Sequence, residues 1–163
     1  MANFSGTNGN DTLTPTTVPA GVFVFPFGAV PSGVADLVNG NGGNDVLDGG
    51  GGADTVNGGD GNDTIDVRLG GDHDGGDDND TFLVFSAGAA TTIVGGAGTD
   101  TFDAQGSQNI TGATLSGIEN LALDSSTLTL TTSQLAVFTD IIADGAATTG
   151  NIVLSAGGGA TTD

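Results

Sequence analysis

The residues best suited to chemistry in this chain are aspartates and glycines that recur at a fixed spacing. From Gly40 to Asp66 the sequence reads GNGGNDVLD, GGGGADTVN and GGDGNDTID, which is one nine-residue phrase repeated three times without a break. Each copy follows the form G-G-x-G-x-D-x-(apolar)-x, so one carboxylate follows a glycine-rich stretch. Carboxylate and carbonyl oxygens in flexible turns suit Ca²⁺ better than Mg²⁺ or a transition metal. The spacing therefore predicts several calcium sites.

The elements that must position these carboxylates are short turns and short strands. A fixed short period predicts a solenoid in which each repeat is one turn-plus-strand unit. Glycine supplies the positive φ angles that a tight turn requires. The apolar residue of each strand is expected to face the core; these residues are Leu47, Val56, Ile65, Phe82 and Phe102. A flexible Gly/Asp-rich linker is the alternative, but a linker has no reason to repeat an apolar residue every nine positions.

The pattern extends beyond the three intact copies in both directions. A degenerate copy occupies 6–14, and further copies occupy 75–83 and 95–103. Between them the phase is damaged, because Asp72 follows Asp63 by nine residues but Asp74 stands where an apolar residue belongs.

Two single residues near this irregular part of the repeat are interpreted without a functional role. His73 is interpreted as a solvated loop histidine among acids. Arg68 is the only strong cation and is expected to pair with a nearby aspartate, an interaction worth little at a surface.

Two segments lie outside the repeats. An insert at 15–39 contains the alternating run VFVFPF, which predicts a strand that either caps the first coil or docks on a neighbouring subunit. From 104 onward Thr, Ser, Leu and Ile replace Gly and Asp, and short strands are predicted at 118–123, 127–131, 141–143 and 152–154, with a helical turn at 133–138.

These observations predict an all-β protein. Its fold would be a parallel β-roll or β-helix solenoid with calcium-binding turns, continuing into a calcium-poor β-solenoid. We expect the chain to divide into three parts. Residues 1–39 contain the degenerate repeat and the Phe-rich insert, residues 40–103 form the calcium-binding roll, and residues 104–163 form the Thr/Ser/Leu-rich solenoid. An antiparallel sandwich is the structural alternative.

Composition excludes several functions. The chain has 163 residues, 20 acidic residues against one basic residue, and a net charge of −19, so neither nucleic acid nor an anionic membrane is an expected partner. All the acids except Glu119 are aspartates, which favour turns over helices. With one His and no Cys, Tyr or Lys, the chain offers almost no general base or nucleophile, and we expect no enzyme activity. The apolar run at 22–30 is too short to span a bilayer.

The nonapeptide resembles the calcium-binding repeat of the repeats-in-toxin (RTX) family over 6–14 and 40–103. The opening MANFSGTNGNDTL looks like the natural start of RTX proteins, and ITGATLSGIENLALD (110–124) resembles a strand block found after such repeats in bacterial surface proteins. The resemblance implies a bacterial protein exported by type I secretion without an N-terminal signal peptide, which folds in calcium outside the cell or at its surface. The ending GGGATTD departs from the family, since it shows no recognisable export signal.

The resemblance also implies how the aspartates stack. In the RTX β-roll two nonapeptides make one coil, so Asp45 would lie over Asp63, Asp63 over Asp80, and Asp54 over Asp72 at the opposite edge. Two carboxylates about 4 Å apart repel by about 4 kcal/mol at an effective dielectric constant of about 20, and Ca²⁺ between them offsets that repulsion. Several calcium ions are expected, with these candidate ligands: Asp11, Asp45, Asp54, Asp60, Asp63, Asp72, Asp77, Asp80, Asp100, Gly40, Gly42, Gly49, Gly51, Gly58, Gly75 and Gly95.

The expected function is structural. We predict a secreted, calcium-dependent protein that self-assembles as a surface-layer, filament or matrix subunit, through its solenoid ends and residues 22–30. A cell-surface polysaccharide is a further candidate partner. Two alternatives stay open: a non-catalytic folding and secretion module of a larger type I-secreted enzyme or adhesin, and an ice- or carbohydrate-binding solenoid, suggested by TLTLTT at 127–132.

Overall fold

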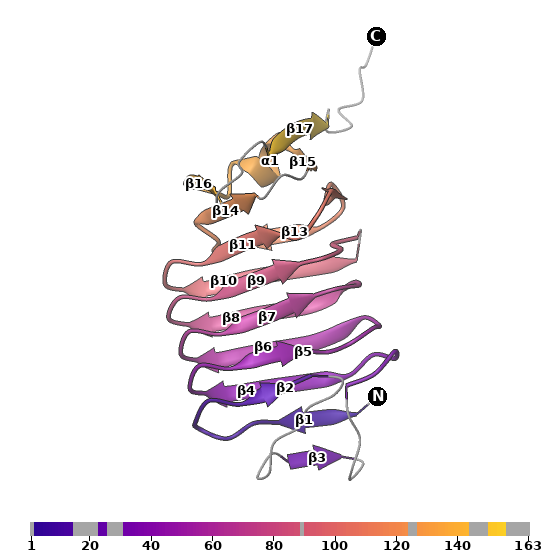
Figure 1. The fold of residues 1–163 in the computed structure, drawn as a ribbon, viewed down its shortest axis with the longest axis vertical. Helices are drawn as coiled ribbons and strands as arrows, with labels where there is room; N and C mark the ends of the chain where they lie inside the picture. Colours follow the sequence, from indigo (N-terminus) through magenta and orange to yellow (C-terminus); the bar gives the residue numbers. More distant parts are fainter. Residues whose placement is uncertain are drawn as a thin grey trace.

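The chain winds into a solenoid of stacked coils with a sheet on each of two opposite faces (Figure 1). The computed structural model describes residues 2–14, 23–25, 31–88, 90–123, 127–143 and 150–155. Apart from residues 23–25 of the insert, which pair antiparallel, the strands of both sheets pair in parallel from coil to coil, so the predicted all-β parallel solenoid is confirmed and the antiparallel sandwich is wrong. Within these ranges, no helix is long and apolar enough to cross a bilayer.

Two seven-stranded sheets form the body of the solenoid. Sheet A runs in the spatial order β13 (Thr114–Ser116), β10 (Thr91–Ala97), β8 (Gly71–Asp77), β6 (Asp54–Asp60), β4 (Leu37–Gly42), β1 (Asn3–Ser5) and β3 (Phe23–Phe25). Sheet B runs in the order β16 (Asp140–Ala143), β14 (Asn120–Leu123), β11 (Thr101–Ala104), β9 (Thr81–Val84), β7 (Thr64–Val67), β5 (Val46–Asp48) and β2 (Thr12–Leu13).

The C-terminal part adds a small third sheet, in the order β12 (Gln108–Asn109), β15 (Thr127–Thr131) and β17 (Asn151–Ser155). The strands β14, β15, β16 and β17 lie close to the predicted ranges, whereas β12 was not predicted. The predicted helical turn is the short helix α1 (Thr132–Leu135), which begins at a capping box between Thr131 and Gln134.

The core is a stack of apolar side chains between the two sheets. Sheet A contributes Phe4, Val38, Val56 and Ile93, and sheet B contributes Leu13, Leu47, Ile65, Phe82, Phe102 and Leu121, all of them buried. The five side chains predicted to face inward therefore do so. Full burial of one such side chain stabilises the fold by about 1.5–3 kcal/mol. This core sets the register of the coils, and hence the height of each turn.

One coil is shorter than its neighbour, and this changes which residues face inward. Corresponding residues lie 18 apart from Asp45 to Asp63 but only 17 apart from Asp63 to Asp80. The missing residue lies in the turn between β7 and β8, because Asp54 pairs with Gly71 and Val56 with His73. The side chain of His73 consequently takes the inward place between Val56 and Ile93 and is only 3% exposed.

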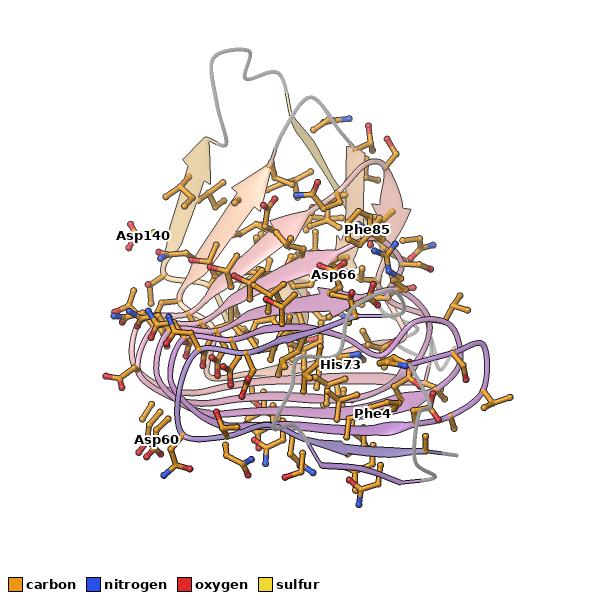
Figure 2. The ribbon with its side chains drawn as sticks, turned by 60° about the horizontal axis from the view of Figure 1, so that its bottom comes forward. Phe4, Asp60, Asp66, His73, Phe85 and Asp140 are labelled. Carbon is orange, nitrogen blue, oxygen red and sulfur yellow. The ribbon has the colours of Figure 1, made fainter. Side chains whose placement is uncertain are left out.

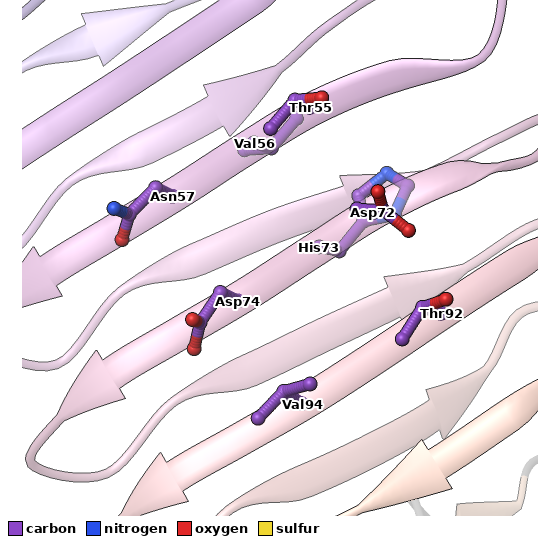
Figure 3. Close-up of a pocket in the computed structure, with 8 residues that line it drawn as sticks. All are labelled: Thr55, Val56, Asn57, Asp72, His73, Asp74, Thr92 and Val94. Carbon is purple, nitrogen blue, oxygen red and sulfur yellow. The ribbon is translucent and has the colours of Figure 1, made fainter.

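The prediction of a solvated His73 is therefore wrong. The prediction that Asp74 occupies the apolar slot is wrong as well, since Asp74 is exposed on the outer face of β8. Figure 3 shows this face, where Asp72 and Asp74 flank His73 beside a hollow of about 330 Å³. In Figure 2, His73 and Phe4 lie between the sheets, whereas Asp60 lies outside the turns.

Arg68 pairs with aspartates as expected. Its guanidinium lies 2.7 Å from Asp66 and 3.2 Å from Asp48, and it stacks 4.6 Å from the ring centre of Phe85. The cluster joins three successive coils at the outer face of sheet B.

The N-terminal edge of sheet A is covered by part of the insert. β3 pairs antiparallel with β1, which agrees with the cap interpretation for residues 23–25. The rest of the VFVFPF run and of the contact predicted at 22–30 lies outside the described residues.

Candidate functional site: a carboxylate ladder at one edge

Acidic side chains line up along the edge where the chain turns from sheet A to sheet B. In each turn the backbone amide of the acidic residue donates to the carboxylate of the next coil. The bonds run from Asp11 to Asp45 (2.7 Å), Asp45 to Asp63 (2.8 Å), Asp63 to Asp80 (2.8 Å), Asp80 to Asp100 (2.8 Å) and Asp100 to Glu119 (2.9 Å). We call this row the carboxylate ladder. The predicted stacking of Asp45, Asp63 and Asp80 matches its geometry.

These amide bonds use only one oxygen of each carboxylate. The other oxygen, Oδ2, is buried without a hydrogen-bond partner in Asp45, Asp63, Asp80 and Asp100. A buried charged oxygen without a partner is costly, and a bound cation is one of the few groups that satisfies it. The orphaned oxygens therefore mark the inner side of the ladder as a place for cations.

Glycines bring a second kind of oxygen to the same places. A Cβ on Gly58 would collide with Asp63 Oδ2 and with the carbonyl oxygen of Gly75 in the next coil. Gly40, Gly75 and Gly95 stand in the same relation to the aspartate of their own turn and to a glycine carbonyl of the next coil. A carboxylate oxygen and a carbonyl oxygen thus converge where only glycine leaves room.

This donor set fits Ca²⁺, which binds carboxylate and backbone carbonyl oxygens in flexible geometry. In the described part of the chain, no group of three or more His, Cys, Asp or Glu side chains is placed to hold one ion. Carbonyl oxygens would therefore have to complete each site. A bound ion would neutralise the stacked carboxylates.

The electrostatics of the ladder agree with a need for cations. The pKa of Asp63 is raised to about 6 and that of Asp80 to about 7, mainly by burial and in smaller part by the adjacent carboxylates. The amide bond from the preceding coil acts in the opposite direction and lowers both pKa values. Burial also raises the pKa of Asp45 and Asp100. Without a cation, the negative charges of the carboxylate ladder destabilise the folded state.

An asparagine ladder runs beside the carboxylates and was not predicted. The amides of Asn44, Asn62, Asn79 and Thr99 donate to the side-chain oxygens of Asn10, Asn44, Asn62 and Asn79, at 2.8–3.0 Å. Here the later coil donates to the earlier one, whereas in the carboxylate ladder the earlier coil donates to the later. The signal in the sequence was the Asn that directly precedes several of the repeat aspartates.

The opposite edge carries a much shorter row. The amide of Ala2 donates to Asp36 (2.6 Å) and the amide of Asp36 donates to Asp54 (2.9 Å), whose pKa burial raises to about 6. A Cβ on Gly49 would collide with Asp54, as in the main ladder. Asp36 was missed because it lies in the insert, although it precedes Asp54 by one 18-residue coil.

The predicted stack of Asp54 over Asp72 is wrong. Because of the shortened coil, Asp54 pairs with Gly71, and Asp72 lies on the outer face between Thr55 and Thr92 (Figure 3).

The remaining candidate ligands lie away from the converging oxygens. Asp60 and Asp77 pair with each other across adjacent coils and are exposed on the outer side of their turns. A Cβ on Gly42 would make ordinary contacts with Asn8 and Asp60, and one on Gly51 would lie near Gly33. The structure therefore brings together the other repeat aspartates and the first glycine of each turn, but not these four residues or Asp72.

A parallel solenoid with a carboxylate ladder and glycine turns along one edge is typical of metal-binding β-rolls. Comparison with family models agrees: the RTX calcium-binding nonapeptide repeat matches residues 32–72 and 88–110, in four copies. These segments are RTX calcium-binding repeats, as predicted, and such repeats are typical of exported bacterial proteins. No curated protein and no solved structure matches the chain. The matched segments include Asp36 but omit residues 6–14 and 73–87, although Asp11 and Asp80 in those ranges lie in the ladder.

Proposed function

We propose that this protein is a secreted structural protein that folds on binding calcium and assembles end to end into filaments, layers or a matrix. The calcium part is supported by the RTX repeats and by the orphaned oxygens of the carboxylate ladder. The assembly part is supported by one observation, the exposed apolar side chains on the last strands that the structure describes. Two further statements stay predictions: the protein has no enzyme activity, and it binds a cell-surface polysaccharide.

The last strands expose side chains that neighbouring coils bury. Ile141 of β16 pairs with the fully buried Leu121 but is itself 57% exposed, and Leu154 of β17 pairs with the fully buried Leu130 but is 50% exposed. Ile142 and Val153 are also exposed. Both strands stand at the edge of their sheets in the described part of the chain. An exposed apolar edge strand is a template for pairing with another chain.

A second copy could continue the fold at this end. In sheet B, β2 is the edge strand at the N-terminal end and β16 is the edge strand at the C-terminal end. Pairing β16 of one copy with β2 of the next would extend the parallel order of the sheet. Because the two surfaces differ, this contact is head-to-tail and does not close on itself, so it would generate a filament.

The experiment compares assembly with and without calcium. Light scattering and electron microscopy of the wild type should show assemblies in Ca²⁺ that dissolve in EDTA and return when calcium is restored. Ile141→Asp places a charge on the uncovered end and should abolish assembly while leaving the calcium-induced circular dichroism signal intact. Val46→Asp is the matched control, because Val46 is exposed on β5, a strand that already pairs on both sides, with β2 and with β7. This variant should still assemble.

The result that would overturn assembly is a wild type that stays monomeric in saturating calcium at high concentration. That result would favour the folding and secretion module instead. The ice- or carbohydrate-binding alternative gains no support, because Thr127, Thr129 and Thr131 pair with Asn151, Val153 and Ser155 and form no continued threonine ladder.

A further inference from the structure

Glu119 extends the carboxylate ladder beyond the last matched repeat. It is the only glutamate in the chain, and it lies in the turn between β13 and β14, after the matched segments end at residue 110. Its Oε2 accepts the amide of Asp100 at 2.9 Å, as Asp100 accepts the amide of Asp80 at 2.8 Å. Glutamate here takes the ladder position that aspartate takes in every earlier coil.

Independent evidence for a ligand comes from Asp100. The side chain of Asp100 is 0% exposed, and its Oδ2 has no hydrogen-bond partner. A Cβ on Gly95 would collide with this oxygen and with the carbonyl of Gly117, which belongs to the same turn as Glu119. The same convergence occurs at Gly58, with Asp63 and the carbonyl of Gly75. The orphaned oxygen of Asp100 thus points to where a cation would bind.

The charge of Glu119 also acts on Asp100. Burial is the largest cause of the raised pKa of Asp100, and the Glu119 carboxylate raises it further, against the amide bond from Asp80. The two acids therefore repel each other across this last step of the ladder. A divalent cation between them would remove the repulsion.

We propose that Glu119, Asp100 and the carbonyl of Gly117 form a further calcium site that joins the RTX repeats to the C-terminal part. The inference rests on the calcium binding proposed above, and it assigns a role to a residue outside the repeats. The longer glutamate side chain supplies the carboxylate to a turn that has no Gly-x-Gly-x-Asp sequence.

The site would couple calcium to the folding of strands that have no repeats of their own. The backbone carbonyl of Glu119 accepts the amides of Thr139 (2.8 Å) and Asp140 (3.0 Å); Asp140 is the first residue of β16, and Thr139 directly precedes it. Ordering Glu119 by calcium therefore also orders the start of the next coil. The uncovered end formed by Ile141 would then appear only after this site fills.

The experiment counts bound ions and follows the folding of each part. Glu119→Gln keeps the side-chain length and an oxygen for the Asp100 amide, but it loses the charge. Native mass spectrometry in calcium should show one ion fewer than in the wild type. Hydrogen exchange should show that protection of 139–143 requires about tenfold more calcium, a change of about 1.4 kcal/mol, while protection of 45–67 is unchanged. Asp140→Asn, an exposed acid one coil further, is the control and should match the wild type.

Two outcomes would overturn this inference alone. One is an unchanged ion count and calcium midpoint in Glu119→Gln. The other is loss of 139–143 protection in Glu119→Ala with Glu119→Gln fully normal, which would make Glu119 a purely structural hydrogen-bond acceptor. A wild type that binds no calcium would instead overturn the proposed function itself.

Discussion

Four aspartates of the ladder use their two carboxylate oxygens for different purposes; these are Asp45, Asp63, Asp80 and Asp100. One oxygen of Asp63 accepts the amide of Asp45, and the other is buried beside Gly58 without a partner. The preceding residue, Asn62, donates its amide to the earlier coil, so the turn is held from both directions. The turn thus has its own hydrogen bonds before an ion enters, and the remaining oxygen is free to bind calcium.

Asp63→Asn tests, at a single position, whether one carboxylate oxygen accepts the amide while the other binds calcium. The amide side chain keeps an oxygen for the Asp45 amide, but it places an NH₂ group where calcium would need an oxygen. We expect at least one ion fewer by native mass spectrometry and a calcium midpoint for folding raised about tenfold or more, since calcium affinity follows the charge of its ligands. Asp60→Asn, in the same turn but exposed, removes equal charge and should change the midpoint little. Identical titrations for both variants would contradict the assignment.

The periodic elements could be predicted from sequence because one short phrase specifies both turn and strand. Leu47, Ile65 and Phe82 face inward as their place in the phrase requires. The position of His73 could not be predicted, because the nine-residue spacing from Asp63 to Asp72 hid the loss of one residue from a coil. Asp36 and Glu119 were missed for a related reason. Only the stacking of coils shows that they continue rows whose other members lie far away in sequence.

The shortened coil destabilises the fold at strand β8, because it places a histidine in the core. Burial lowers the pKa of His73 to about 4, and its Nδ1 is buried without a hydrogen-bond partner. His73→Ile would match Val56 and Ile93 in the same column and should raise the free energy of unfolding by about 1–3 kcal/mol, the usual cost of a buried unsatisfied polar group. Urea denaturation in saturating calcium measures the effect. The polar control His73→Gln should bring no such gain, and equal stability of all three proteins would contradict the explanation.

At the scale of the whole molecule, the net charge of −19 and the buried acids predict a pH dependence that calcium reverses. The raised pKa values of Asp54, Asp63 and Asp80, about 6 to 7, mean that the calcium-free folded state binds more protons than the unfolded chain above about pH 4. Stability in EDTA should therefore fall as the pH rises from about 5 to about 7.5. His73, with its lowered pKa, opposes this trend below about pH 6.5, where the unfolded chain binds its proton more readily.

Circular dichroism during thermal denaturation measures this dependence. In EDTA we expect more β-structure and a higher Tm at pH 5.5 than at pH 7.5. Saturating calcium should remove or reverse the difference, because the ion binds the charged carboxylates. Calcium-free protein that becomes steadily more stable from pH 5.5 to pH 7.5 would contradict the electrostatic description of the ladder.

The two ladders also determine how the molecule would respond to force. Their bonds run from coil to coil along the solenoid axis, so a pull along that axis loads the steps in series. Detaching one end coil would break one carboxylate step and one asparagine step and would release the calcium ion proposed for that step, while the coils behind stay intact. A released coil of 18 residues adds up to roughly 60 Å of chain. A filament of such coils would lengthen stepwise under load, with calcium setting the force at each step.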